Sequence, residues 1–101
     1  NPDTIISHVK LVKVAGTAEQ LTSVNLSYGL GVSVKALSTN EGTVYVGGSQ
    51  VDAQDHTVAY SLTAGETIEY QIKNLSSIWL DADNSNDGIV WTSEIRSTTN
   101  G

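Results

Sequence analysis

The stretch DNSNDGIVWTSE, residues 83–94, decides between two folds. Acidic or hydroxyl side chains occupy its first, third and fifth positions, glycine the sixth and glutamate the twelfth, which is the spacing of an EF-hand calcium loop. An EF-hand also needs a helix on each side of the loop. The flanking segments instead alternate, and they are rich in Trp, Ile, Val and Thr, which favour strands.

Strand geometry argues against the calcium interpretation. If residues 88–95 are extended, Glu94 lies about six steps of 3.3 Å from Gly88 and is too far away to join the same ion. The Asp-Gly pair between two alternating apolar runs is instead typical of a hairpin turn, which we therefore expect here. A weaker alternative stays open, in which loop carboxylates of Asp81, Asp83 and Asp87 collect a cation.

Alternation with a period of two recurs along the rest of the chain. In TIEYQIK, residues 67–73, the apolar side chains are Ile68, Tyr70 and Ile72, and polar residues separate them. Such runs of four to seven residues predict half-buried strands, and Gly, Asn, Asp or Ser clusters between them predict turns. The expected strands are roughly 5–14, 21–28, 30–37, 43–47, 57–62, 66–73, 76–82 and 88–95.

The first of these runs, IISHVKLVKV at residues 5–14, is less regular. Val9 and Leu11 share one face of an extended chain, and Val12 and Val14 share the other. A bulge near Leu11 and Val12 would return both pairs to the core. An amphipathic helix is the alternative, although the β-branched content disfavours it.

Eight short strands with turns about 8–12 residues apart indicate an all-β fold. We expect one domain, residues 1–101, that forms an antiparallel two-sheet β-sandwich of the jelly-roll or Greek-key type.

Composition excludes several classes of protein. The net charge is −6, and residues 51–101 hold eight acids against two bases. An acidic surface repels phosphate, so binding to nucleic acid or to an anionic membrane is not expected. There is no cysteine, which removes disulfides and thiolate metal sites.

No pattern indicates catalysis. His8 and His56 are the only histidines, and neither has a further metal ligand spaced beside it. No glycine-rich loop precedes a helix, and no serine lies in a nucleophile elbow. We expect no enzyme activity, no metal site and no cofactor.

Aromatic residues are the better candidates for function. Trp79 lies between Ile78 and Leu80, so by alternation it points away from their face. It is then either covered by another segment or available to a partner, since exposed tryptophan is typical of interfaces and of sugar-stacking platforms. The interface candidates are Tyr45, Trp79, Trp91 and Arg96.

Residues 41–83 resemble the small β-sandwich proteins and domains of tailed-phage virions. Those chains often carry a G-x-V-Y-V-G strand, then L-x-x-G-E-x-I, then an L-S-x-I-x-x-x-A strand. The matching residues here are Gly42, Val44, Tyr45, Val46, Gly47, Leu62, Gly65, Glu66, Ile68, Leu75, Ser76, Ile78 and Ala82.

The resemblance implies a structural virion protein, most readily a capsid decoration or auxiliary head protein located in the virion. Its partners would be capsid or tail proteins of the same particle and further copies of itself. The alternative is a carbohydrate-binding or receptor-binding β-sandwich module, assisted by calcium at residues 81–88. That module would need an exposed aromatic platform, whereas an assembly protein needs a docking surface.

Overall fold

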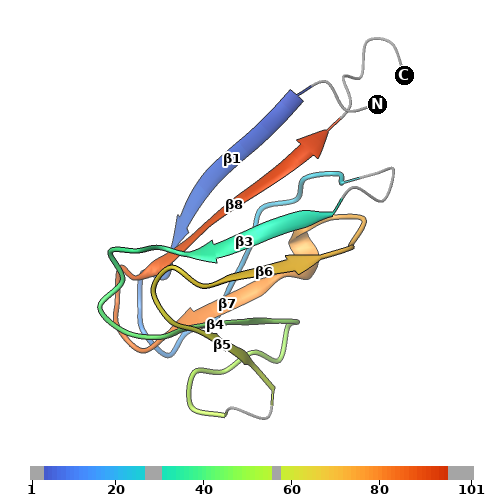
Figure 1. The fold of residues 1–101 in the computed structure, drawn as a ribbon. Coiled ribbons are helices and arrows are strands. Elements are labelled where there is room, and N and C mark those ends of the chain that lie inside the picture. Colours follow the sequence, from blue (N-terminus) through green and yellow to red (C-terminus); the bar gives the residue numbers. More distant parts are fainter. Residues whose placement is uncertain (1–3, 27–30, 56–57, 96–101) are drawn as a thin grey trace.

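The computed structural model describes residues 4–26, 31–55 and 58–95, and it places two four-stranded antiparallel sheets face to face. We call them sheet A and sheet B. Sheet A has the order β1-β8-β3-β6, formed by Thr4–Leu11, Gly88–Ile95, Val32–Ala36 and Thr67–Tyr70. Sheet B has the order β2-β7-β4-β5, formed by Glu19–Gln20, Trp79–Ala82, Val44–Gly47 and Tyr60–Leu62 (Figure 1).

Strand pairing follows the order of a jelly roll. The first strand pairs with the last, β2 with β7, β3 with β6 and β4 with β5. This is the pattern of one long antiparallel ribbon wrapped so that alternate pairs lie in opposite sheets. The prediction of an eight-stranded antiparallel sandwich is confirmed.

The core lies between the sheets and is built from the alternating apolar residues of the central strands. Val34 of β3, Val46 of β4, Leu80 of β7 and Ile89 of β8 have no exposed surface. Residues on the other side of each strand face outward, as the period of two requires. Trp91 of β8 also belongs to this core.

The turn at residues 83–87 differs from the expected hairpin. β7 pairs with β2 and β4 in sheet B, whereas β8 pairs with β1 and β3 in sheet A, so the turn carries the chain from one sheet to the other. Asn86 has a φ of 74°, and left-handed backbone of this kind is well tolerated by Asn in a turn. The turn was predicted correctly, but the hairpin pairing was wrong.

Close packing explains the glycine of the EF-hand-like pattern. A Cβ built on Gly88 would lie 2.1 Å from the backbone oxygen of Lys10 and 2.8 Å from the Cα of Leu11. Any other residue would therefore push β1 away from β8. Gly88 opens a strand, and no helix follows it.

The second strand, β2, lies just before the expected range 21–28, and the seventh strand, β7, is shorter than the expected 76–82. Pairing of the two segments keeps one register, from Glu19↔Leu80 to the isolated bridge Asn25↔Asn74. Between those points a one-turn 3-10 helix, η2 (Leu75–Ser77), interrupts the ladder. The Asn74 side chain caps this turn by accepting a hydrogen bond from the backbone N–H of Ser76. Residues 27 and 28 of the expected strand lie outside the described residues.

The first strand also ends earlier than expected, and the predicted bulge is wrong. β1 stays in regular register with β8 up to Leu11. The chain then turns inward at Val12, whose N–H donates to the Asp87 carbonyl and whose carbonyl accepts from Asn86 N–H. Val12 is fully buried, while Val9 and Leu11 remain exposed.

Candidate interaction surface

β1 presents three of its four large apolar side chains to solvent. Its register places His8 opposite the buried Trp91, so Ile6, His8 and Lys10 lie on the inner side of sheet A. The odd-numbered residues face outward, and Ile5, Val9 and Leu11 are 71%, 57% and 39% exposed. We call these three residues the β1 face.

The β1 face holds most of the exposed large apolar side chains in the described residues. With Val14, which follows it in the chain, it accounts for four of the five, and Tyr60 of β5 is the fifth. Apolar residues scattered singly on a surface need no explanation, whereas several on one face of a strand make that face a candidate interaction surface. The sequence alone placed Val9 and Leu11 in the core, so this surface was missed.

β1 is also a free edge of sheet A. It is eight residues long, and among the described residues it pairs only with β8, so no other described strand lies along its second edge in Figure 1. Long edges are normally blocked by proline, bulges or charged side chains. β1 contains no proline, and its register is regular, so the inward-directed Lys10 is the one blocking device of this kind on the strand.

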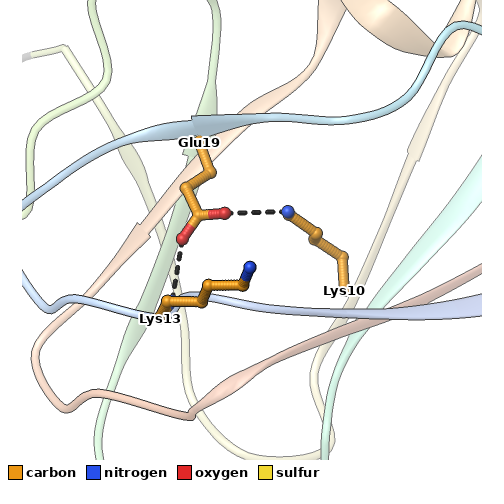
Figure 2. Close-up of polar contacts among 3 residues, drawn as sticks. All are labelled: Lys10, Lys13 and Glu19. Carbon is orange, nitrogen blue, oxygen red and sulfur yellow. Dashed lines mark hydrogen bonds and ion pairs between the residues drawn. The ribbon is translucent and has the colours of Figure 1, made fainter.

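The single charged side chain of β1 is turned toward the other sheet. The Nζ of Lys10 lies 2.8 Å from Oε1 of Glu19, and the backbone N–H of Lys13 donates to Oε2 at 2.8 Å (Figure 2). Glu19 belongs to β2 of sheet B. The ion pair therefore joins the two sheets at this margin, and it does not shield the outer surface of β1.

This contact lowers the pKa of Glu19. The hydrogen bond from Lys10 contributes most, followed by the one from the Lys13 backbone. A lowered folded-state pKa stabilises the fold above the ordinary value of 4.5, and this contribution is lost as the pH falls through the lowered pKa.

We predict a pH-dependent effect of Glu19→Gln. At neutral pH the variant should be less stable by about 0.5–1 kcal/mol, because the pair is partly exposed. The difference should shrink in acid, where the unchanged protein also loses the charge of Glu19. Urea unfolding at neutral pH and in acid measures this, with the exposed Glu41→Gln as the matched control. Identical pH profiles for the two variants would contradict the prediction.

Trp79 lies on the outer side of sheet B and is partly covered. It packs with Tyr45, Val51 and Ala53 in a second apolar cluster, to which the segment after β4 contributes. The sequence left two alternatives for Trp79, cover by another segment or availability to a partner, and the structure agrees better with cover. Trp79 keeps some exposed surface, but it does not form an open aromatic platform.

Tyr45 is 3% exposed, and its hydroxyl donates to the carboxylate of Asp83 at 3.1–3.2 Å. Burial raises the pKa of Tyr45, and the nearby Asp83 raises it further. Trp91 is 4% exposed, and its ring centroid lies 5.6 Å from that of His8. Both residues therefore offer almost no surface to a partner. Arg96, the fourth candidate, lies outside the described residues, as does His56.

The carboxylates near the 83–87 turn do not converge on a cation. Asp81 is fully buried and accepts hydrogen bonds from the backbone N–H groups of Gly16, Ala53 and Ala82. Asp87 is also buried, but its carboxylate binds the backbone of a different loop.

Asp87 accepts from the backbone N–H groups of Glu41 and Gly42. Within the described ranges, no group of three His, Cys, Asp or Glu side chains is placed to hold a metal ion. Each of the two buried carboxylates instead holds loop backbone in place.

Among the described residues, two of the grooves border strands of sheet A. The larger, about 380 Å³, crosses the outer side of the sheet and is lined mainly by polar groups, among them Ser33, Glu69 and Thr92. The smaller, about 290 Å³, lies beside the inner side of β1 between Lys10, Trp91 and Val24. Neither presents an open aromatic surface of the kind that sugars stack on.

No protein-family model matches the chain, and comparisons with curated proteins and with solved structures likewise found no match. In the part of the chain that the structure describes, no helix is long and apolar enough to cross a membrane. The functional argument therefore rests on the surface itself and on the resemblance of residues 41–83.

Proposed function

We propose that this protein is a structural component of a tailed-bacteriophage virion, acting as a capsid decoration or auxiliary head protein. The observation that carries the proposal is the β1 face. It combines three outward apolar side chains with an unpaired backbone edge on one strand. Such a surface is costly in a solitary protein, because it attracts other strands, and it is useful in one that assembles.

The jelly-roll fold is compatible with the proposed role as a virion protein. The fold is common in capsid domains, though it also occurs in lectins and cupins, so it does not by itself name a function. The residues that carry the resemblance to phage proteins lie at core and turn positions of this fold. Val44 and Ala82 are buried in the core, and Gly65 has a φ of 86° in the turn before β6.

Docking through the β1 face needs no catalytic group. Burial of apolar surface would drive association, at about 25 cal/mol for each Å² removed from water, and ordering costs would offset part of it. A specific contact of this kind covers at least about 1,000 Å² in total. The three apolar residues would form its centre, and polar neighbours such as Ser7 and Thr92 would form its rim.

The test is the composition of the particle. Gradient-purified virions produced from the genome that encodes this chain should contain it in many copies, as measured by quantitative mass spectrometry. Heads separated from tails should retain it. Absence from the virions would contradict the proposal, and retention on tails alone would contradict the assignment to the head.

A further inference from the structure

β1 contributes little to the core of the sandwich. None of the side chains of residues 5–11 is fully buried, and Val12, which follows β1, is the one buried residue of this segment. β8 has the same length and buries Ile89, Trp91 and Ser93. Segments with few buried contacts open locally at a lower free-energy cost than core strands do. β1 can therefore leave β8 while the central strands of both sheets stay folded.

The structure shows which sequence fits the edge of β8, because β1 occupies it. The ring of His8 lies against that of Trp91, with 5.6 Å between the centroids, and the Nζ of Lys10 lies 2.8 Å from Oε1 of Glu19. Gly88 has no room for a side chain beside the backbone of Lys10. All of these contacts join β1 to later parts of the chain, so β1 of a second copy can make them equally well.

The connection between β1 and β2 has the properties of a hinge. None of residues 13–18 is buried, and Gly16 has a φ of 89°, a backbone conformation that glycine adopts freely. Opening the loop costs the hydrogen bond from the Gly16 N–H to Asp81. Once extended, six residues span about 20 Å, which is enough to carry residues 4–12 onto an adjoining molecule.

We propose that copies of this chain exchange β1, so that residues 4–12 of one copy take their place beside β8 of another. The inference rests on the proposed assembly function and names a second copy as the partner. The closed and exchanged forms share the same strand contacts, so they differ mainly in the hinge and in the entropy of association. A lattice that holds many copies close together favours the exchanged form. The β1 face stays on the outer side of sheet A, available to the head.

Cysteine cross-linking tests the exchange, because the chain has no cysteine of its own. Ile6 lies directly opposite Ser93, and Ser93 is buried on the inner side of sheet A. Opposed Cα atoms on antiparallel strands lie about 4.5–5.5 Å apart, which a disulfide can span. Ser93→Cys in one chain therefore comes within reach of Ile6→Cys in another when β1 of the second chain has replaced that of the first.

Chains with Ile6→Cys alone and chains with Ser93→Cys alone, mixed at high concentration with a mild oxidant, should form a disulfide-linked heterodimer. The matched control mixes Ile6→Cys with Ala36→Cys, since Ala36 is also buried but lies on β3, away from β1. Its yield should be several-fold lower, and circular dichroism checks that each variant is folded. No heterodimer from the first mixture, or equal yields from the two mixtures, would overturn the proposal.

A second variant ties β1 to its own chain. Ser7 and Thr92 are opposed and exposed on the outer side of sheet A, and their hydroxyl oxygens lie 2.7 Å apart. Ser7→Cys with Thr92→Cys in one chain, oxidised at high dilution, should close an intramolecular disulfide. The oxidised chain should stay monomeric in size-exclusion chromatography at concentrations where the reduced chain forms dimers. Equal dimer content in the oxidised and reduced states would contradict the exchange.

The outcome is separable from the proposed function, because both experiments use the purified chain and no particle. A chain that forms no heterodimer but is abundant on heads would sink only the exchange of β1. A heterodimer from a chain that is absent from virions would support the exchange and sink the virion role.

Discussion

Replacing Asp81 by alanine is expected to lower the free energy of unfolding by about 2–5 kcal/mol, which approaches the whole stability of some domains of this size. The carboxylate has no exposed surface and accepts backbone hydrogen bonds at 2.8–3.0 Å from Gly16, Ala53 and Ala82. Its removal leaves these donors without their partner. Equilibrium unfolding in urea measures the loss.

Two further variants separate the hydrogen bonds from the charge. Asp81→Asn keeps the shape and one acceptor oxygen, so it should cost less than Asp81→Ala. Asp83→Ala removes an exposed neighbour that accepts from the Tyr45 hydroxyl, and it should cost about 1 kcal/mol or less. An Asp81→Ala protein as stable as the Asp83→Ala protein would contradict this account of the loops.

The second large effect is expected from Trp91→Ala, which should destabilise the fold by about 3–5 kcal/mol. Trp91 is a core residue between the sheets, and its loss would leave a large cavity. Trp79→Ala is the matched control and should cost less, because Trp79 is only partly buried. Urea-unfolding curves of the two variants show which substitution lowers the free energy of unfolding more.

The Trp91 result also bears on the interface candidates. If Trp91→Ala kept full stability and instead abolished assembly, Trp91 would be a contact residue in a molecule packed differently from this one. A loss of stability, with the effect of Trp79→Ala clearly smaller, agrees with the described core. The two outcomes are distinguished by measuring unfolding and particle binding on the same preparations.

Alternation was sufficient to predict the class of fold, because polar and apolar residues change sides regularly in the central strands. Val32, Val34 and Ala36 of β3 are all buried, as their spacing indicates. The same rule rejected the EF-hand, because the twelve-residue pattern needs helices where the flanks alternate as strands. These inferences depend on local chain geometry, which a sequence displays directly.

Prediction from local chain geometry failed where contacts with a segment distant in the sequence determine the structure. The Asp-Gly turn looks the same whether the next strand returns to its neighbour or crosses to the other sheet, so hairpin and crossover could not be told apart. The inward turn at Val12 depends on hydrogen bonds to Asn86 and Asp87, which lie far along the chain. The side chain of Asn74 likewise bonds a distant segment, because it accepts from Val24 N–H and donates to the Ser23 hydroxyl.

The candidate surface was missed for a related reason. Both sides of residues 5–14 carry apolar residues, so alternation alone does not say which side is buried. The register with β8 decides it, by placing His8 against Trp91 and turning Val9 outward. The sequence nevertheless displays an unusual feature. In an extended strand, His8 and Lys10 lie on one face and Val9 and Leu11 on the other, and one of these two faces had to be exposed to water.

The central claim is that the outward side of β1 is a docking surface, and occupancy of the phage head measures it most directly. Val9→Glu places a charge in the middle of the β1 face, and Ser61→Glu places the same charge on an exposed position of β5 in the other sheet. Heads produced with the Val9→Glu chain should carry at most about a tenth of the normal copies, while Ser61→Glu should bind normally and both chains should fold. Equal occupancy by the two variants would contradict the claim.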